Sequence, residues 1–351
     1  MVKDYVLHGG AFKMDKQTPI EKIRNYYEIS KYLNESQKLE LKENLGITNE
    51  DERRINGLEN ETEFLMMIYL LGWAKNITAI DESASPLTGT KTSDFLVETI
   101  NGKKIAIEVK SSKKYEIKFS KKLVLDKKNF SEGYNCEAYF AIKLAGHWML
   151  FSNQYIIEHN FKISLTKDFV NSELNDILGE RIFLFPKGLE ILSIYSKKKK
   201  GVGIQHPHYG NLIRITIKIF GKKVYTITTE NKKYLFLSYI LENVQDVMSN
   251  QEQEIKSLDS DRTLILEKFN QDWSLLKLSC FLMAPIKHMI NSELGTPYTF
   301  ELFKEKMKEK DKTFINRNLV LNSLYLLDKE GYPITMFLNK EGYRLGDLKI
   351  K

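Results

Sequence analysis

The alternation of apolar and polar positions predicts three consecutive elements in the first third of the chain. From Glu61 to Gly72, apolar residues at positions 64, 65, 68 and 71 recur with the spacing of a helix, and Gly72 is a stop signal. Residues 103–110 alternate instead with the period of a strand, as do residues 95–99. Asn101-Gly102 between them is a strong hairpin signal. The pattern therefore predicts a helix followed by a β-hairpin.

The pattern predicts further elements on either side of this unit. The chain before residue 57 is charged and has helical spacing, which predicts an N-terminal helical extension over residues 1–56. After the hairpin, β-rich runs predict strands over residues 181–185, 212–220 and 223–228, the last two joined at Gly221-Lys222. Long helices are expected from Tyr234 to Leu258 and from Arg262 to Ile290.

The C-terminal residues have the order helix, turn, helix, hairpin. Helices are expected over residues 299–308 and 313–327, and a two-stranded hairpin over residues 333–345. This order is typical of a winged-helix domain, in which Arg317 on the second helix would meet DNA. A dimerisation or packing module has the same pattern, and the sequence does not separate the two.

Candidate chemistry lies on the predicted hairpin. Because strand side chains alternate, Glu108 and Lys110 point to the same side, and the turn carries Asp94 back alongside them. Two carboxylates offer the hard oxygen ligands that suit Mg²⁺ or Mn²⁺. A lysine beside them offsets charge on a phosphate in the transition state. The pattern favours phosphodiester hydrolysis, against the alternative of an ordinary charged triplet on an exposed strand.

A third carboxylate is expected from the preceding helix. Glu61 lies three and four residues before Phe64 and Leu65, so it shares their inward face, whereas Glu63 is turned away. Glu61 is therefore our candidate, with Glu63 in reserve. The alternative is that both acids are placed in the first helical turn by the helix dipole.

With these residues, positions 57–152 resemble the PD-(D/E)XK nuclease superfamily, and most of all the archaeal Holliday junction resolvase type. The most specific stretch runs from Glu108 to Lys114, and Ser93 stands where the superfamily usually has proline. The resemblance implies a mixed-sheet, restriction-endonuclease-like α/β core. It also implies metal ligation by Asp94 and Glu108, a supporting acid at Glu61 and a catalytic lysine at Lys110, with Mg²⁺ or Mn²⁺ as cofactor.

Length and composition predict several domains around this core. The 351 residues allow an N-terminal extension (1–56), a nuclease domain (57–155), a β-rich then helical middle domain (156–290) and a winged-helix domain (291–351). The fold class is therefore α/β with additional α+β and helical domains. No apolar run approaches the ~20 residues of a membrane helix. We expect a cytoplasmic protein with no membrane partner.

The charge of the chain favours a polyanionic partner. The formal net charge is +7, and lysines gather in the expected nuclease domain. The candidates for contact with duplex or branched DNA are Lys113, Lys114, Lys121 and Lys122. A lysine-rich face that serves solubility alone is the alternative.

The sequence thus predicts a Mg²⁺-dependent endonuclease that hydrolyses DNA, with accessory domains for target recognition, of restriction, recombination or mobile-element type. The alternatives are a Holliday junction resolvase with appended domains, an RNA nuclease, and a nucleic-acid-binding regulatory protein on a nuclease fold. Because one site cuts one strand and a duplex has two strands of opposite polarity, we also expect a homodimer.

Overall fold

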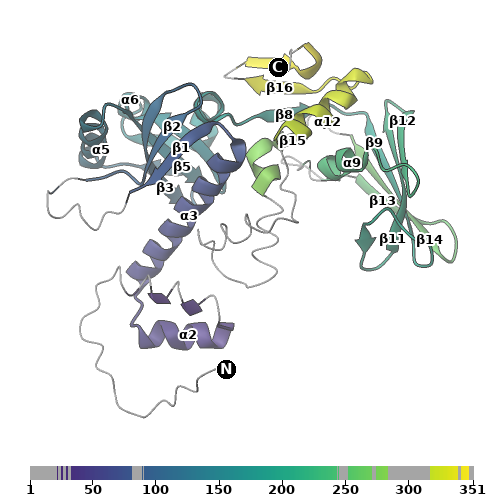
Figure 1. The fold of residues 1–351 in the computed structure, drawn as a ribbon, viewed down its shortest axis with the longest axis horizontal. Coiled ribbons are helices and arrows are strands. Elements are labelled where there is room, and N and C mark those ends of the chain that lie inside the picture. Colours follow the sequence, from purple (N-terminus) through teal and green to yellow (C-terminus); the bar gives the residue numbers. More distant parts are fainter. Residues whose placement is uncertain are drawn as a thin grey trace.

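The computed structural model describes residues 22, 25–26, 29–30, 33–80, 89, 91–242, 244, 252–270, 274–283, 317–338 and 341–347. Three sheets carry most of this part of the chain (Figure 1). A five-stranded sheet and a six-stranded sheet lie on opposite sides of the molecule, and a four-stranded sheet connects them. Within these residues, no helix is long and apolar enough to cross a membrane.

The five-stranded sheet holds the predicted nuclease hairpin. Its order is β1 (Ala74–Ala79), β2 (Phe95–Thr99), β3 (Lys104–Ser112), β5 (Glu137–Leu144) and β6 (His147–Ser152). β3 and β5 are parallel, and the other neighbours are antiparallel. The predicted hairpin is confirmed: Thr99 N–H donates to Lys103 O, and Gly102 has a φ of 80°, which suits glycine.

Helices cover both faces of this sheet. α3 (Asn49–Leu71) packs Phe64, Ile68 and Leu71 against one face, and α5 (Lys121–Gly133) and α6 (Asn153–Glu158) cover the other. α3 ends at Gly72, whose φ of 70° forms a left-handed cap. The predicted helix is thus confirmed, although it begins at Asn49, and α2 (Glu35–Asn44) precedes it.

Short elements complete this unit. They are β4 (Glu116–Lys118), which pairs with β7 (Lys162–Ser164), then α7 (Leu165–Asp168), the 3₁₀ turn η2 (Phe169–Asn171) and α8 (Leu174–Leu178). Expected domain boundaries fall inside helices: residues 56 and 57 are both in α3, and residues 155 and 156 are both in α6. The unit built on the five-stranded sheet therefore extends beyond both boundaries.

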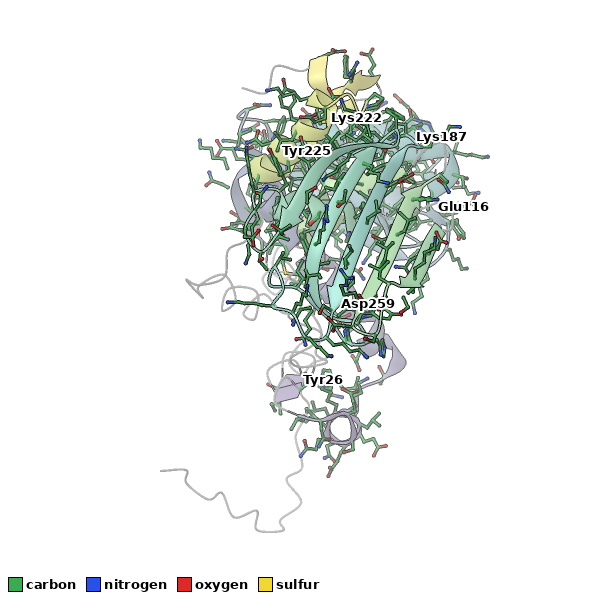
Figure 2. The ribbon with its side chains drawn as sticks, turned by 90° about the vertical axis from the view of Figure 1, so that its right-hand side faces the viewer. Tyr26, Glu116, Lys187, Lys222, Tyr225 and Asp259 are labelled. Atoms are coloured by element: carbon green, nitrogen blue, oxygen red, sulfur yellow. The ribbon has the colours of Figure 1, made fainter. Side chains whose placement is uncertain are left out.

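The six-stranded sheet follows β8 (Ile182–Phe185) in the chain. Its order is β10 (Gln205–His206), β11 (Gly210–Ile219), β9 (Leu189–Ser196), β14 (Arg262–Phe269) and β13 (Glu252–Ser257), with β12 (Lys222–Thr228) also paired to β11. Figure 2 looks onto this sheet, with Lys222 and Tyr225 near one end and Asp259 at the other. The opposite face packs on α9 (Leu235–Glu242) and α12 (Arg317–Lys329).

Two predicted helices are wrong over much of their length. α9 ends at Glu242, and residues expected to be helical form β13, β14 and β15 (Ser274–Lys277) instead. Asp259 explains the reversal, because its carboxylate accepts hydrogen bonds from Asp261 N and Arg262 N and closes a turn. Pairing of β14 with β9 along its whole length then outweighs the helix propensity of this Glu- and Leu-rich segment.

The C-terminal hairpin forms, but not as part of a separate domain. β16 (Thr335–Leu338) pairs with β17 (Glu341–Arg344), and the 3₁₀ turn η3 (Leu345–Asp347) follows. β16 also pairs with β8, so the four-stranded sheet has the order β15, β8, β16, β17. The predicted separate winged-helix domain is corrected to a hairpin within a shared sheet, and the expected helix over 299–308 lies outside the described residues.

Candidate active site

Asp94 and Glu108 meet at one end of the β2–β3 hairpin. Asp94 directly precedes β2, and its backbone N–H donates to Ile107 O at 3.0 Å. Its carboxylate oxygen Oδ2 accepts the backbone N–H of Val109 at 2.6 Å. These bonds hold Asp94 beside the segment that carries Glu108, as the hairpin predicted.

Two lysines hold the Glu108 carboxylate, one at each oxygen. Lys110 Nζ lies 2.6 Å from Oε1, and Lys127 Nζ lies 2.6 Å from Oε2. The side chains of Glu108 and Lys127 are each 4% exposed, and Lys127 also donates to the carbonyl of Thr92. Glu108 is therefore a buried, fully paired carboxylate at the centre of the site.

Lys127 is the site residue that the sequence analysis missed. It lies on α5, where Val124, Lys127, Phe130 and Ser131 form the buried stripe. A lysine at a position of apolar spacing is rarely buried without a partner. That break in the stripe was the available signal, but only the packing of α5 against the sheet shows that its partner is Glu108.

The pKa values of the site show crowded negative charge. Burial first, and then the charges of Glu108 and Glu61, raise the pKa of Asp94 to about 8. Burial lowers the pKa of Lys110, but the nearby carboxylates outweigh it, so that this pKa lies above its ordinary value. The carboxylates around Asp94 therefore favour the binding of positively charged groups at this site.

Glu61 and Glu63 have separate surroundings, but the predicted helical phase is wrong for Glu63, which was expected to turn away from the inward face and is the more deeply buried of the two. Glu61 is half-buried, and its charge acts on both Asp94 and Lys110. Glu63 is buried elsewhere: its Oε2 lies 2.7 Å from Lys143 Nζ, and its Oε1 accepts Trp148 Nε1–H at 3.2 Å. The reserve acid therefore attaches α3 to β5 and β6.

The donor set fits a divalent cation held by few protein ligands. Asp94 and Glu108 supply hard carboxylate oxygens, and a cation there would stabilise the charged form of Asp94, which burial and the neighbouring carboxylates disfavour. Across the described part of the chain, no cluster of three or more His, Cys, Asp or Glu side chains forms a complete metal site. Mg²⁺ suits such an incomplete set, because it keeps several waters and binds substrate phosphate oxygens.

The four candidate lysines for DNA contact lie on one stretch of surface chain after β3. Lys113 and Lys114 follow the strand, and Lys121 and Lys122 form the first turn of α5. All four are exposed. They lie within the chain segment 111–126, which joins Lys110 to Lys127.

Arg317 does not join them. Its guanidinium lies over the Trp73 ring at 5.3 Å and donates to Leu71 O at 3.2 Å. Arg181 lies over the same ring at 5.0 Å. Burial and the neighbouring charge of Arg317 lower the pKa of Arg181 to about 10. Arg317 therefore packs α12 against the end of α3, apart from the four lysines with which the sequence grouped it as a DNA contact.

The comparison with protein-family models agrees with this placement. Residues 72–181 match the family model of the archaeal Holliday junction resolvases (Hjc). A solved structure of Archaeoglobus fulgidus Hjc, a Holliday junction resolvase from an archaeal hyperthermophile, is 28% identical, covering 30% of this chain and 85% of that one with a TM-score of 0.26. No curated protein matches the chain.

The matched residues contain Asp94, Glu108, Lys110 and Lys127, but not Glu61 on α3. They also continue past the end of the predicted nuclease domain, as the fold does. The resemblance of this module to the archaeal Holliday junction resolvases is therefore confirmed for residues 72–181.

Proposed function

We propose that the protein is a metal-dependent endonuclease that cuts DNA, with a four-way junction as the preferred substrate. The observation that carries the proposal is the convergence of Asp94, Glu108 and Lys110 within the matched residues. Burying several charged groups in one small space is costly for folding. A site that keeps such groups together is a candidate for catalysis.

Each side chain receives a role from its position. Asp94 and Glu108 would hold Mg²⁺ or Mn²⁺, which when bound activates a water and neutralises charge on the phosphate. The ammonium of Lys110 faces the same space and would offset negative charge that develops in the transition state. Lys127 on α5 would hold the Glu108 carboxylate in place. Glu61 on α3 would add negative charge beside Asp94.

The DNA backbone would bind along Lys113, Lys114, Lys121 and Lys122. Lys121 and Lys122 stand in the first turn of α5, which contains no acidic residue. Positive side chains at a helix N-terminus oppose the helix dipole. A bound phosphate removes this conflict, because both the dipole and the lysines then act on a negative charge.

We further propose that the two other sheets select the target and that the active form is a homodimer. Symmetric cleavage of a junction needs two sites related by an approximate twofold axis. Light scattering on the protein alone, and on an Asp94→Asn complex with a junction, tests the dimer. A monomer in both states, together with paired cuts on one junction, would mean two successive nicks by one site.

A cleavage assay tests the activity. Purified protein with Mg²⁺ or Mn²⁺ is offered a four-way junction, linear duplex, single-stranded DNA and RNA, with Asp94→Asn protein as the control. We expect cuts in the junction at lower enzyme concentration than in linear duplex. Preference for linear duplex would favour a restriction-type enzyme, cutting of RNA alone would favour an RNA nuclease, and binding without cleavage would favour a regulatory protein.

A further inference from the structure

The strand β13 forms an open edge of the six-stranded sheet. It pairs with β14 along one side, and no strand among the residues that the structure describes pairs with its other side. Figure 2 shows this hairpin in pale green at one side of the sheet. Every residue from Gln253 to Leu258 is exposed. An open edge of this kind presents unpaired backbone N–H and C=O groups to another strand.

The turn that ends β13 shows which backbone groups point to the open edge. Leu258 N–H donates to Arg262 O at 2.9 Å, so the backbone groups of Leu258 point toward β14. Successive residues of a strand direct these groups to alternate sides, and the register of β13 against β14 runs without a bulge. The N–H and C=O groups of Gln253, Ile255 and Ser257 therefore point to the open edge.

The side chains of β13 form a symmetric pattern around Ile255. Ile255 stands opposite the buried Ile265 on the helix-covered face of the sheet, yet it is 49% exposed. Glu254 and Lys256 lie on the other face, because strand side chains alternate. Both are about half exposed, and Glu254 Oε1 lies 2.7 Å from Lys256 Nζ. Opposite charges thus stand one residue before and one residue after an exposed apolar side chain.

This pattern is complementary to a second copy of itself. When a second β13 runs antiparallel with the twofold axis beside Ile255, the two Ile255 side chains face each other, and each Glu254 faces a Lys256. Gln253 then faces Ser257, so all the backbone groups that point to the edge find partners. A twofold axis beside Glu254 or Lys256 would set like charges opposite each other, which is destabilising. The charges therefore select the register centred on Ile255.

We propose that β13 pairs with β13 of a second copy of this chain in that register, which joins the two six-stranded sheets into one continuous sheet. The inference rests on the homodimer proposed above and names its contact. It involves none of the groups of the Glu108 site. The opposite charges and the exposed Ile255 specify this partner, since the same strand supplies both halves of each pair.

The pairing determines where the two active sites lie. Residues opposite each other in an antiparallel pair point to the same face, so the twofold axis is perpendicular to the sheet and the helix-covered faces of both copies lie on one side. Figure 1 shows the unit of the five-stranded sheet on that side of the six-stranded sheet. Both active sites therefore lie on the same side of the joined sheet, which suits symmetric cleavage of one junction.

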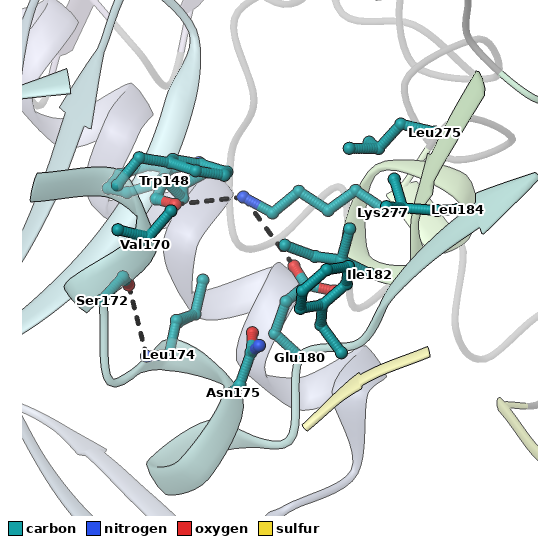
Figure 3. A pocket seen from close by; sticks show the side chains of 12 residues that line it. Trp148, Val170, Ser172, Leu174, Asn175, Glu180, Ile182, Leu184, Leu275 and Lys277 are labelled. Carbon is teal, nitrogen blue, oxygen red and sulfur yellow. Dashed lines mark hydrogen bonds and ion pairs between the residues drawn. The ribbon is translucent and has the colours of Figure 1, made fainter. Parts of the chain in front are cut away.

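A buried contact holds the five-stranded sheet to the rest of each copy. Lys277 on β15 extends along a largely apolar cavity between the two parts of the chain (Figure 3). Its Nζ donates to Trp148 O on β6 at 3.0 Å and lies 4.0 Å from Glu180 Oε2. Lys277 and Glu180 are both buried, and breaking a buried charge pair is costly. Each active site thus keeps its place relative to the twofold axis.

Sedimentation velocity of the full chain, without DNA or metal, tests the contact apart from cleavage. We expect the natural sequence to dimerise at micromolar concentration. Glu254→Lys and Lys256→Glu each set like charges opposite each other in both pairs and should raise the Kd of the dimer about tenfold. Lys223→Glu is the matched control, because Lys223 is an exposed lysine on β12, at the far side of the sheet. Circular dichroism checks that each variant folds.

A mixture of the two charge variants is the decisive measurement. In a mixed dimer, every pair again joins opposite charges, so the mixture should recover the affinity that each variant alone has lost. Energy transfer between differently labelled variants measures this recovery. No recovery, or a monomer of the natural sequence throughout, would overturn the inference. A dimer that neither variant weakens would also overturn it but leave the homodimer in place, and DNA cleavage by a monomer would leave the proposed activity in place.

Discussion

The five-stranded and six-stranded sheets bury different kinds of residue. In the first, Glu108 is 3% exposed, and its partner Lys127 on α5 is 4% exposed. In the second, the buried polar residues of the described strands are the serines Ser193 and Ser196, and the rest of the buried face is apolar. Both sheets are covered by helices, so the difference lies in the buried side chains, which are charged in the first sheet and mostly apolar in the second.

We expect this difference to separate activity from stability. Replacing a buried ion pair by apolar residues is often neutral or stabilising, so stability alone does not explain the Glu108 cluster. An apolar interior, by contrast, stabilises the fold directly. We therefore expect changes at the charged groups of the five-stranded sheet to alter activity most, and changes in the apolar interior of the six-stranded sheet to alter stability rather than the rate of cleavage.

The largest effect is expected at the two carboxylates. Asp94→Asn and Glu108→Gln remove charges that would hold the metal, which is worth several kcal/mol of transition-state stabilisation, or about a thousandfold in rate or more. Cleavage of a labelled junction measures the loss. Glu190→Gln is the control, because Glu190 pairs with Lys218 at 3.6 Å on the six-stranded sheet. Near-normal cleavage by either site variant would refute the assignment.

Removal of Lys127 should come next. Lys127→Met leaves Glu108 buried without its second cation, which should lower the free energy of unfolding by about 3–5 kcal/mol. Urea denaturation measures this loss, and added Mn²⁺ should restore part of it by supplying a cation. The neighbour Lys128 is exposed and pairs with Glu132 at 3.8 Å, so Lys128→Met should change stability little. Equal effects of the two substitutions would contradict the proposed role of Lys127.

A core deletion tests the other sheet. Ile217 on β11 is fully buried, and Ile217→Ala should lower the free energy of unfolding by about 2–5 kcal/mol. Cleavage per folded molecule should stay unchanged. A fall in activity without a fall in stability would show that the six-stranded sheet takes part in catalysis.

The lysines near the site should determine the salt dependence of binding. Replacing Lys113, Lys114, Lys121 and Lys122 by glutamine should reduce the slope of log affinity against log salt by about three to four, close to one for each phosphate contact. Fluorescence anisotropy with a labelled junction measures the slope. The control replaces the run 197–200, whose four lysines follow β9 on the six-stranded sheet. A larger reduction of the slope in the control variant would indicate that the DNA binds at the six-stranded sheet instead.

The smallest contrast separates the two acids of α3. Glu61→Ala should reduce the cleavage rate about tenfold with little change in stability, because Glu61 acts through charge on the site. Glu63→Ala should instead lower the free energy of unfolding by about 1–3 kcal/mol, because it breaks the bonds to Lys143 and Trp148. Both variants are measured by urea denaturation and by cleavage of a labelled junction. A loss of stability for Glu61→Ala and a loss of cleavage rate for Glu63→Ala would mean that the two roles are exchanged.

The sequence by itself determined the hairpin that carries the candidate site. Side-chain alternation put Glu108 and Lys110 on one side of β3, and Asn101-Gly102 returned Asp94 beside them. Each of these conclusions depends on residues that are close in sequence. Local backbone geometry fixes such relations before any distant contact forms.

Only the tertiary structure decided the rest. The segment 252–269 has helix-forming residues, but it became two strands because β14 pairs with the distant β9. Lys127 became a site residue because α5 packs over β3, and Arg317 became a packing residue because α12 meets Trp73. The cavity at Glu180 likewise forms between segments far apart in the chain. Such outcomes depend on which distant segments pack against each element. The periodicity of apolar residues predicts which face of a helix or strand is buried, but it does not predict which segment covers that face.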